Sequence, residues 1–396
     1  MGPSLVKRRK ICVVTTSRAD YGLVRGLMAA VKSDPTLRLQ VIVSGMHFSA
    51  KLGNTWRDIV ADGFTIDAKV RMRLEGDSAL ENVESVGSGI SGFARAFSKL
   101  RPEFLVLLGD RFELFAPAIS ALMLQIPIAH IHGGELSEGA IDDSVRHAIT
   151  KMSSLHFPAT EVYRRRIIAM GEQPDRVFNF GAPGLDQIRR LPLMSKAELA
   201  QDLALSFREP VAIVTYHPVT RETGVDTQIG ALLKAVKQSR ITAVFTAANA
   251  DAQGARINAR LKSFCEAEPD RFKWVPHLGH RRYLSCLAHF DLMIGNSSSG
   301  LTEAPSFRLP VVNVGDRQNG RVKGANVIDV PCTASGISGG VRRALSVRLR
   351  SSLRNSRSPY ERYRDGRVSE RIKDVLKETE ISSDFLKKRF NDVPGR

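Results

Sequence analysis

Acidic and basic side chains follow several apolar runs in the first half of this sequence. The strings are Gly109-Asp110-Arg111, His132-Gly133-Gly134-Glu135 and Ile141-Asp142-Asp143. Carboxylates that share one site can acquire different pKa values, so that one accepts a proton while another donates one. These residue types therefore suit acid–base chemistry. A network of structural salt bridges to Arg111 and Arg146 is the alternative interpretation.

A second group of polar residues indicates a phosphate ligand. The string Asn296-Ser297-Ser298-Ser299-Gly300 follows an apolar run and precedes a helical segment, and N–H groups at a helix N-terminus attract phosphate. Glu303, one turn into that helix, suits the two hydroxyls of a ribose, and Arg317 offers a charged partner for phosphate. A nucleotide ligand is therefore expected, although a simple serine N-cap explains the first string equally well.

Other residues after apolar runs complete the candidate set: Arg18, His47, His217 and Asn249. The acidic residues are too scattered along the chain to indicate a metal site, so no metal is predicted. No serine lies in a G-x-S-x-G string, and Cys12 falls inside the first apolar run. A covalent nucleophile is therefore not expected.

Short β-branched runs that alternate with helical stretches must position these side chains. The first series is Ile11–Thr16, Leu39–Ser44, Phe104–Gly109, Ile126–Ile131, Leu155–Pro158 and Val177–Phe180. The second series is Val211–Tyr216, Thr242–Ala247, Phe272–Val275, Leu292–Ile294, Val311–Val314 and Val327–Val330. This alternation predicts parallel α/β structure, in which ligands bind beyond the carboxyl ends of the strands.

Two doubly wound, Rossmann-like domains follow from these two series. We expect the first over residues 1–188 and the second, which binds the nucleotide, over 189–366. Residues 367–396 form a C-terminal helix and tail. The helix, over Ser369–Glu378, has Ile372, Val375 and Leu376 on one face and can pack back on the first domain. The polar ends of both strand series would face a common ligand cleft.

The string Gly87-Ser88-Gly89-Ile90-Ser91-Gly92 matches the G-x-G-x-x-G pattern of dinucleotide-binding folds. That pattern needs a strand immediately before it, whereas Ala79–Val86 is polar and typical of a helix. We interpret these glycines as positions of close helix packing.

Composition places the chain among ordinary globular proteins and excludes several classes. It has 396 residues, of which 43% are apolar and 25% charged, and no apolar run long enough to span a membrane. The four cysteines are widely scattered without a C-x-x-C pair, which indicates reduced thiols and a cytoplasmic location.

The net charge of +17 raises the question of a nucleic-acid partner. Most of the excess lies at the chain ends, with sixteen Lys and Arg against eight Asp and Glu in residues 341–396. These ends lack interleaved aromatic residues and any nucleic-acid-binding motif. We therefore expect a solvated basic surface and no nucleic-acid partner.

Several strings together resemble one known family, the hydrolysing UDP-N-acetylglucosamine 2-epimerases of sialic acid biosynthesis. The matching strings are Ser17-Arg18-Ala19-Asp20-Tyr21-Gly22, Gly109-Asp110-Arg111, His132-Gly133-Gly134-Glu135, Ile141 to Lys151, His217-Pro218-Val219-Thr220 and Gly295-Asn296-Ser297-Ser298. They occur in order and span nearly the entire chain.

The resemblance implies a glycosyltransferase-B-like fold and conversion of UDP-N-acetylglucosamine and water to N-acetylmannosamine and UDP. The family's mechanism abstracts the C2 proton and expels UDP, which leaves a glycal. Water then adds, with protonation at C2 from the other face. Such a reaction needs acid–base groups and positive charge but no cofactor. The resemblance also implies a homo-oligomer, either a dimer or a tetramer.

Roles for the candidate residues follow from their matching positions. The implied acid–base set is Asp110, Glu135, Asp142 and Asp143, with His217 near the leaving phosphate. The implied substrate-binding set is Arg18 and Arg317 for the diphosphate, Ser297 and Ser298 for its oxygens, Glu303 for the ribose, and Asn249. Arg111 and Arg146 either touch the substrate or orient the carboxylates. His47 either lines the sugar pocket or is a loop histidine bonded to the backbone.

Departures from the related non-hydrolysing epimerases favour the hydrolysing branch. Those enzymes carry a lysine shortly after the first arginine and an arginine-rich stretch after the histidine of the second domain. Here the corresponding residues are Leu23 and Val24, and Pro218-Val219-Thr220. Within the hydrolysing branch, the motifs do not separate UDP-N-acetylglucosamine from UDP-N,N'-diacetylbacillosamine or a GDP-linked sugar. Glycosyl transfer to an acceptor, on the same fold, is the competing enzyme class.

Overall fold

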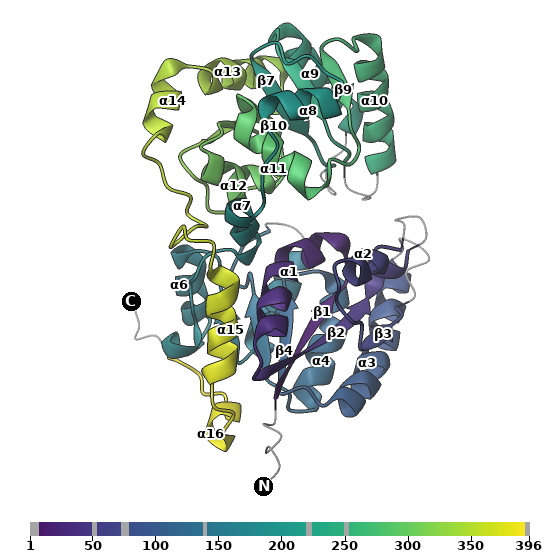
Figure 1. Ribbon diagram of the computed structural model, residues 1–396, viewed down its shortest axis with the longest axis vertical. Helices are drawn as coiled ribbons and strands as arrows, with labels where there is room; N and C mark the ends of the chain where they lie inside the picture. Colours follow the sequence, from purple (N-terminus) through teal and green to yellow (C-terminus); the bar gives the residue numbers. More distant parts are fainter. Residues whose placement is uncertain are drawn as a thin grey trace. The chain divides into compact units, whose positions relative to one another are not determined.

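The computed structural model describes residues 8–49, 54–72, 79–137, 141–218, 224–248 and 253–392. The chain forms two compact units, coloured along the sequence in Figure 1. The first unit combines Met1–Arg189 with Tyr360–Arg396, and the second is Arg190–Pro359. The first unit is therefore built from both ends of the chain.

A parallel sheet forms the centre of the first unit. Its strands are β1 (Arg9–Thr15), β2 (Leu37–Ser44), β3 (Ala68–Val70), β4 (Phe104–Leu108), β5 (Ile128–Ile131) and β6 (Leu155–Phe157). They lie in the order β3-β2-β1-β4-β5-β6. Alternate residues of β1 enter different cores, with Ile11 and Val13 on one face and Cys12 and Val14 on the other. Both faces of the sheet are therefore covered, as in a doubly wound fold.

Helices of the first unit pack on these two faces. They are α1 (Arg18–Ser33), α2 (Trp56–Ala61), α3 (Ala79–Leu100), α4 (Phe115–Met123), α5 (Ile141–Met152), α6 (Glu161–Ala169), α7 (Asp186–Arg190), α15 (Val368–Glu378) and α16 (Ser383–Leu386). A capping box between Ser17 and Asp20 begins α1 directly after β1. This cap fixes the turn at the carboxyl end of the first strand.

The helix expected over Ser369–Glu378 is α15, which lies beside α1 (Figure 1). Its Ile372 and Leu376 are buried in the core that α1 shares with the sheet. A Cβ atom on Gly26 of α1 would lie 2.8 Å from the Ser369 hydroxyl, so a glycine at this position lets the two helices approach closely. The last part of the chain thus completes the first unit.

The second unit repeats the same strand order. Its strands are β7 (Val211–Thr215), β8 (Thr242–Phe245), β9 (Phe272–Trp274), β10 (Leu292–Gly295), β11 (Val311–Val314) and β12 (Val327–Val330), in the order β12-β11-β10-β7-β8-β9. Its helices are α8 (Lys196–Asp202), α9 (Val225–Gln238), α10 (Gly254–Ala267), α11 (Gly279–His289), α12 (Ser299–Thr302), α13 (Ala334–Ala344) and α14 (Val347–Leu353). The prediction of two doubly wound α/β folds is confirmed.

One predicted strand was wrong, and one strand was missed. Val177–Phe180 is not a strand, since only Val177 forms a single bridge, to His156. Phe178 and Phe180 instead stack on Phe157, which explains why this run is apolar without being paired in the sheet. The strand β3 was not expected, because it has only three residues and its Lys69 is exposed.

The glycine string Gly87–Gly92 lies inside α3, as interpreted from the sequence. A Cβ atom on Gly89 would lie 2.9 Å from the Cβ of Ala116 on α4, and one on Gly92 would lie 2.7 Å from Val70 of β3. The interpretation as close helix packing is confirmed at Gly89, whereas Gly92 lies close to a strand and a Cβ atom on Gly87 would meet nothing within 4 Å. Among the helices that the structure describes, no helix combines the length and apolar character needed to cross a membrane.

Candidate functional site

The strand order places polar loops at one edge of each sheet. In the first sheet the order reverses between β1 and β4, and in the second between β7 and β10. Ligands of such sheets bind beyond the carboxyl ends of the strands at this point of reversal. Most candidate residues lie in the segments that follow strands of the two sheets, and Asp142, Asp143 and Arg146 lie on α5.

Arg146 gathers the carboxylates of the first unit. It lies on α5, is 1% exposed, and forms ion pairs with Asp110, directly beyond β4, and with Asp143. Its guanidinium also donates hydrogen bonds to the main-chain oxygen of Glu135 (3.0 Å) and the hydroxyl of Ser137 (2.9 Å). One buried cation therefore holds parts of three sequence motifs together.

Glu135 is paired with His132 at the end of β5. The carboxylate lies 2.7 Å from Nδ1 of His132, and Glu135 is 6% exposed. The Nε2 atom of His132 is buried and has no hydrogen-bond partner among the described residues. When a carboxylate accepts the proton of Nδ1, the lone pair of a neutral imidazole lies on Nε2. This pair can therefore accept a proton from a ligand and later return it.

Asp142 and Asp143 occupy the first turn of α5, where the helix dipole favours negative charge. Asp143 accepts a hydrogen bond from the main-chain N–H of Ser137 at 2.7 Å and lies 3.6 Å from the imidazole of His147. Burial lowers the pKa of His147 despite that carboxylate. Asp142 is half-buried. The start of α5 therefore presents two acids next to the Arg146 cluster.

Arg111 follows Asp110 but is paired with a different carboxylate. It donates to Glu113 at 2.7 Å, and Glu113 is fully buried. Burial alone would lower the pKa of Arg111, but the Glu113 carboxylate more than offsets that effect and the pKa is raised. Arg111 therefore remains charged, and its charge compensates a buried acid.

His47 lies between two threonine hydroxyls in the interior of the first unit. Its Nε2 is 3.0 Å from the hydroxyl of Thr15 and its Nδ1 is 2.8 Å from that of Thr55. Burial lowers the pKa of His47, so that the ring is neutral at pH 7. Arg18, at the start of α1, is half exposed and lies 3.6 Å from Asp58. His47 therefore lies beyond β2, and Arg18 lies beyond β1.

In the second unit, Asn296 joins the ends of β7 and β10. Its side chain accepts a hydrogen bond from the N–H of His217 (2.7 Å) and donates one to the carbonyl of the same residue (2.8 Å). The main-chain oxygen of Asn296 accepts from Arg317 (3.0 Å) and from Gln318 (2.8 Å). His217 and Arg317, which are 100 residues apart in the chain, therefore lie at one strand edge.

Burial and the nearby charge of Arg317 lower the pKa of His217 to about 3. The imidazole is therefore neutral at pH 7, and it can take part in a hydrogen bond without repelling the arginine. The Arg317 guanidinium provides the positive charge that a diphosphate needs at this edge. The two residues together suit a phosphate group that leaves with negative charge.

The segment after β10 differs in detail from the expectation. The helix α12 is a single turn, Ser299–Thr302, and Glu303 directly follows it instead of lying inside a longer helix. The Glu303 carboxylate accepts a hydrogen bond from the Thr302 hydroxyl at 2.6 Å. Ser297 and Ser298 are half-buried and directly precede α12. Asn249 lies outside the described residues.

The sequence predicted the strand-end residues and offered Arg111 and Arg146 as residues that orient the carboxylates, but it gave no role to several other residues that support the site. His132, Asn296 and Asp20 stood in the quoted strings without an assigned role. Asp20 accepts hydrogen bonds from Thr15 and Thr16, and its spacing of three residues from Ser17 was the available signal of a cap. In the part of the chain that the structure describes, no cluster of three or more His, Cys, Asp or Glu could hold a metal ion.

Comparison with known proteins gives a consistent result. Residues 29–377 match the sequence profile of the family described as UDP-N-acetylglucosamine 2-epimerase. A GDP/UDP-N,N'-diacetylbacillosamine 2-epimerase (hydrolyzing) from Campylobacter jejuni is 38% identical, with 82% of this chain and 85% of that protein covered. A UDP-N,N'-diacetylbacillosamine 2-epimerase (hydrolyzing) from Legionella pneumophila is 37% identical, with 96% and 98% covered.

Further similarity comes from a polysialic acid biosynthesis protein and from a solved structure. Polysialic acid biosynthesis protein P7 of Escherichia coli is 36% identical, with 98% of each chain covered. The structure of Methanocaldococcus jannaschii UDP-GlcNAc 2-epimerase with UDP-GlcNAc and UDP superimposes with a TM-score of 0.75 at 16% identity, covering 93% of this chain and 100% of that one. The structural likeness concerns the fold.

Proposed function

We propose a reaction for this chain from the family to which it belongs, that of the UDP-N-acetylglucosamine 2-epimerases. The chain is a nucleotide-sugar 2-epimerase of the hydrolysing type. Its substrate is a nucleotide-linked 2-acetamido sugar, which it converts with water to the free 2-epimeric sugar and the nucleoside diphosphate.

The proposed substrate is UDP-N,N'-diacetylbacillosamine. This proposal rests on the two relatives that carry the name and are 38% and 37% identical to the chain. UDP-N-acetylglucosamine, which the family resemblance had put first, becomes the second candidate. It is supported by a UDP-N-acetylglucosamine 2-epimerase from Neisseria meningitidis that is 30% identical over 86% of this chain.

The carboxylate site of the first unit supplies the acid–base chemistry in this proposal. A base removes the C2 proton, the C1–O bond to the diphosphate breaks with its electron pair leaving on oxygen, and a glycal remains. Water then adds to C1 while an acid protonates C2 from the opposite face. The Glu135–His132 pair and the Arg146-bound Asp110 are suited to these two opposite roles, because their environments differ.

The strand edge of the second unit binds the nucleotide in this proposal. Arg317 and the neutral His217 meet the diphosphate, with Ser297 and Ser298 as hydrogen-bond donors to its oxygens. Glu303 accepts hydrogen bonds from the ribose hydroxyls. Arg18 is a further candidate ligand of the diphosphate, as the family resemblance implies. Arg111 and Arg146 act through the carboxylates that they bind.

An NMR assay in D2O tests both the reaction and the substrate. The protein is incubated separately with UDP-N,N'-diacetylbacillosamine and with UDP-N-acetylglucosamine, and release of UDP and deuterium at C2 of the free sugar are followed. We expect UDP release with C2-deuterated product, and faster turnover of the first substrate. Preferential turnover of UDP-N-acetylglucosamine would overturn the substrate, and UDP release without C2 exchange would overturn the elimination mechanism.

A further inference from the structure

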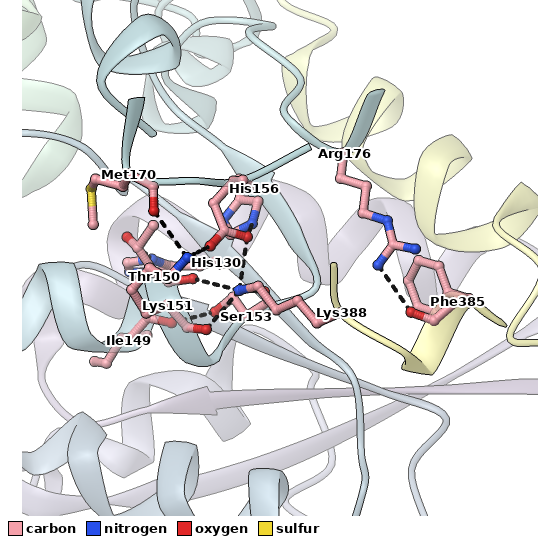
Figure 2. A network of polar contacts seen from close by, with 11 residues as sticks. His130, Ile149, Thr150, Lys151, Ser153, His156, Met170, Arg176, Phe385 and Lys388 are labelled. Atoms are coloured by element: carbon pink, nitrogen blue, oxygen red, sulfur yellow. Dashed lines mark hydrogen bonds and ion pairs between the residues drawn. The ribbon is translucent and has the colours of Figure 1, made fainter. Parts of the chain in front are cut away.

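The segment after α16 carries a lysine that reaches the end of α5. The Lys388 ammonium donates to the main-chain oxygens of Lys151 (2.6 Å) and Ser153 (2.7 Å), and Thr150 O lies 3.5 Å away (Figure 2). These carbonyls belong to the last turn of α5 and the residues directly beyond it. Although residue 388 lies at the surface, its side chain is only 28% exposed. Lys388 thus serves as a cationic cap for a helix whose C-terminus would otherwise present unsatisfied carbonyls.

The same ammonium binds a buried carboxylate. Glu172 is 2% exposed and lies 2.7 Å from Lys388, 2.5 Å from Lys151 and 2.9 Å from Nε2 of His156 on β6. Burial alone would raise the pKa of Glu172, but these three donors lower it to about 2. Lys388 therefore joins α5, β6 and the loop after α6 from outside the sheet.

The chain around Lys388 is fixed at both sides. Arg176 donates to the carbonyl of Phe385 at 2.9 Å and lies over its ring, with 4.6 Å to the centroid. Beyond Lys388, the N–H of Asn391 donates to the carbonyl of Gly171 at 2.9 Å. These contacts place the lysine, so its position at the end of α5 does not depend on its own bonds alone.

Two routes lead from this cap to the carboxylate site. Along α5, the capped Thr150 is one helical turn from Arg146, which binds Asp110 and Asp143. Across the sheet, the hydroxyl of Thr150 lies 3.1 Å from Nδ1 of His130, whose Nε2 lies 2.8 Å from the carbonyl of Gly109. Gly109 directly precedes Asp110. Both routes end at the same carboxylate.

We propose that Lys388 is a positioning residue for the reaction: by holding the C-terminal carbonyls of α5 together with Glu172, it fixes the helix that presents Arg146 to Asp110. The proposal rests on the proposed function of the Arg146 cluster. It assigns a catalytic consequence to a residue near the end of the chain that touches no part of the strand-end site.

The charge state of Lys388 gives this proposal a pH signature. Burial and the positive charges of Lys151 and Arg176 lower its pKa to about 8, although Glu172 acts in the opposite direction. The imidazole of His156 faces the same carboxylate. Burial lowers the pKa of His156, so this imidazole is neutral. Above pH 8 the ammonium therefore loses its proton, and with it the charge that caps α5.

The test compares Lys388→Met, Lys388→Arg and the matched control Lys387→Met, whose lysine is exposed in the same segment. For Lys388→Met we expect kcat to fall roughly tenfold or more, since small displacements of catalytic groups have effects of this size. KM should change less than about twofold, because the nucleotide-binding edge is untouched. In Lys388→Arg most of kcat should be restored. The decrease in kcat that the wild type shows above about pH 8 should occur at higher pH in this variant.

Hydrogen exchange of residues 141–152 separates this proposal from the proposed function. Faster exchange of this segment in folded Lys388→Met, but not in Lys387→Met, would support the capping role even if neither nucleotide sugar were turned over. Unchanged exchange, a kcat within about twofold of wild type, or an equal loss in Lys387→Met would each overturn the proposal.

Discussion

Arg146 introduces a full positive charge into the interior of the first unit, where a charge is tolerated only when it is paired and hydrogen-bonded. Its partners Asp110 and Asp143 come from a loop beyond β4 and from its own helix. The guanidinium fork can meet both carboxylates and the Glu135 carbonyl at once, which the ammonium of a lysine could not do with the same geometry. The side chain is therefore suited to keeping several acids in fixed positions.

Replacing Arg146 by Met should remove this organisation. We expect a loss of kcat of roughly a hundredfold or more, because the acids lose their orientation, and a decrease of about 3 kcal/mol in the free energy of unfolding from uncompensated charge. Steady-state kinetics and urea denaturation measure the two effects. Arg95→Met, an exposed arginine on α3, is the control. An Arg146→Met enzyme with near-wild-type kcat would remove the cluster from the mechanism.

The neutral state of His217 predicts a dependence of stability on pH. Its pKa in the folded protein is about 3, below the roughly 6.5 of an unfolded chain, so the unfolded state binds more protons between these values. The free energy of unfolding should therefore fall as pH decreases through this window, by up to about 1.4 kcal/mol per pH unit from this residue. Above pH 7 the contribution is constant.

Urea denaturation at pH 7, 6, 5 and 4 checks this prediction. His217→Gln cannot titrate, so its stability should decrease less steeply with acid than that of the wild type. The exposed His280→Gln serves as the comparison for removing a histidine elsewhere in the second unit. Parallel slopes for wild type and His217→Gln would show that the pKa of this imidazole is not lowered in the folded state.

At the level of single residues, the sequence predicted which groups stand at strand ends and offered Arg146 as a residue that orients carboxylates, but it did not predict which carboxylates Arg146 binds. Asp110 and Glu135 follow from the rule that ligands bind beyond parallel strands. The contact of Arg146 with Asp110 joins residues that are distant in sequence, and no local pattern encodes it. The role of Lys388 could not be predicted either. In the sequence it is one of several basic residues in a basic segment, and such residues are usually solvated.

The loop between β10 and α12 depends on a glycine. Gly295 has a φ of +137°, and a Cβ atom there would overlap the carbonyl oxygen of Thr215 on β7. This φ belongs to a region that only glycine adopts readily. The close approach lets the Asn296 amide bind both main-chain groups of His217.

Gly295→Ala should therefore separate β7 from β10 at the nucleotide edge. We expect about 3 kcal/mol or more of lost stability, from backbone strain and steric overlap together, and weaker binding of UDP measured by calorimetry. Gly315→Ala is the matched control. Gly315 also has a positive φ, +78°, but a Cβ atom there would meet nothing within 4 Å. Equal losses in the two variants would show that strain alone, and not the close approach, is responsible.

Most strands could be predicted because buried parallel strands are continuous β-branched runs. The run Val311–Val314 is an example in which the predicted and observed bounds agree. The errors occurred where apolar character had another cause, as in the aromatic stack of Phe157, Phe178 and Phe180. Helix α12 ends early because Pro305 follows closely and has no N–H to donate to the carbonyl of Leu301.

For the whole molecule, each unit has its own hydrophobic core. One core gathers residues of β7, β8 and β10 with α9 and α13, whereas α1, α15 and the first sheet share another. Units with separate cores can unfold in separate transitions. A substitution in one core should therefore affect one transition.

Ile372→Ala and Gly295→Ala test this expectation as a pair. Ile372 is fully buried on α15, so its truncation should lower the stability of the first unit by about 3 kcal/mol. Differential scanning calorimetry should show one transition shifted by Ile372→Ala and the other by Gly295→Ala. A single transition that moves equally in both variants would indicate that the two units unfold as one.

The basic excess of the C-terminal region also has a structural use at this scale. Lys373 and Lys377 of α15 pair with Asp34, and Arg371 pairs with Asp365. The composition suggested a solvated basic surface, and these contacts show that part of it fastens the returning segment to the first unit.

The discontinuous first unit has a consequence for how the protein is made. During synthesis the ribosome delivers residues 1–189, then the whole of the second unit, and only afterwards the residues that cover α1. The second unit can complete its core while the first still exposes the apolar groove that α15 will fill. A premature stop codon after residue 366 would therefore damage the first unit, most of which is translated first. It would spare the second unit, which is translated immediately before the stop.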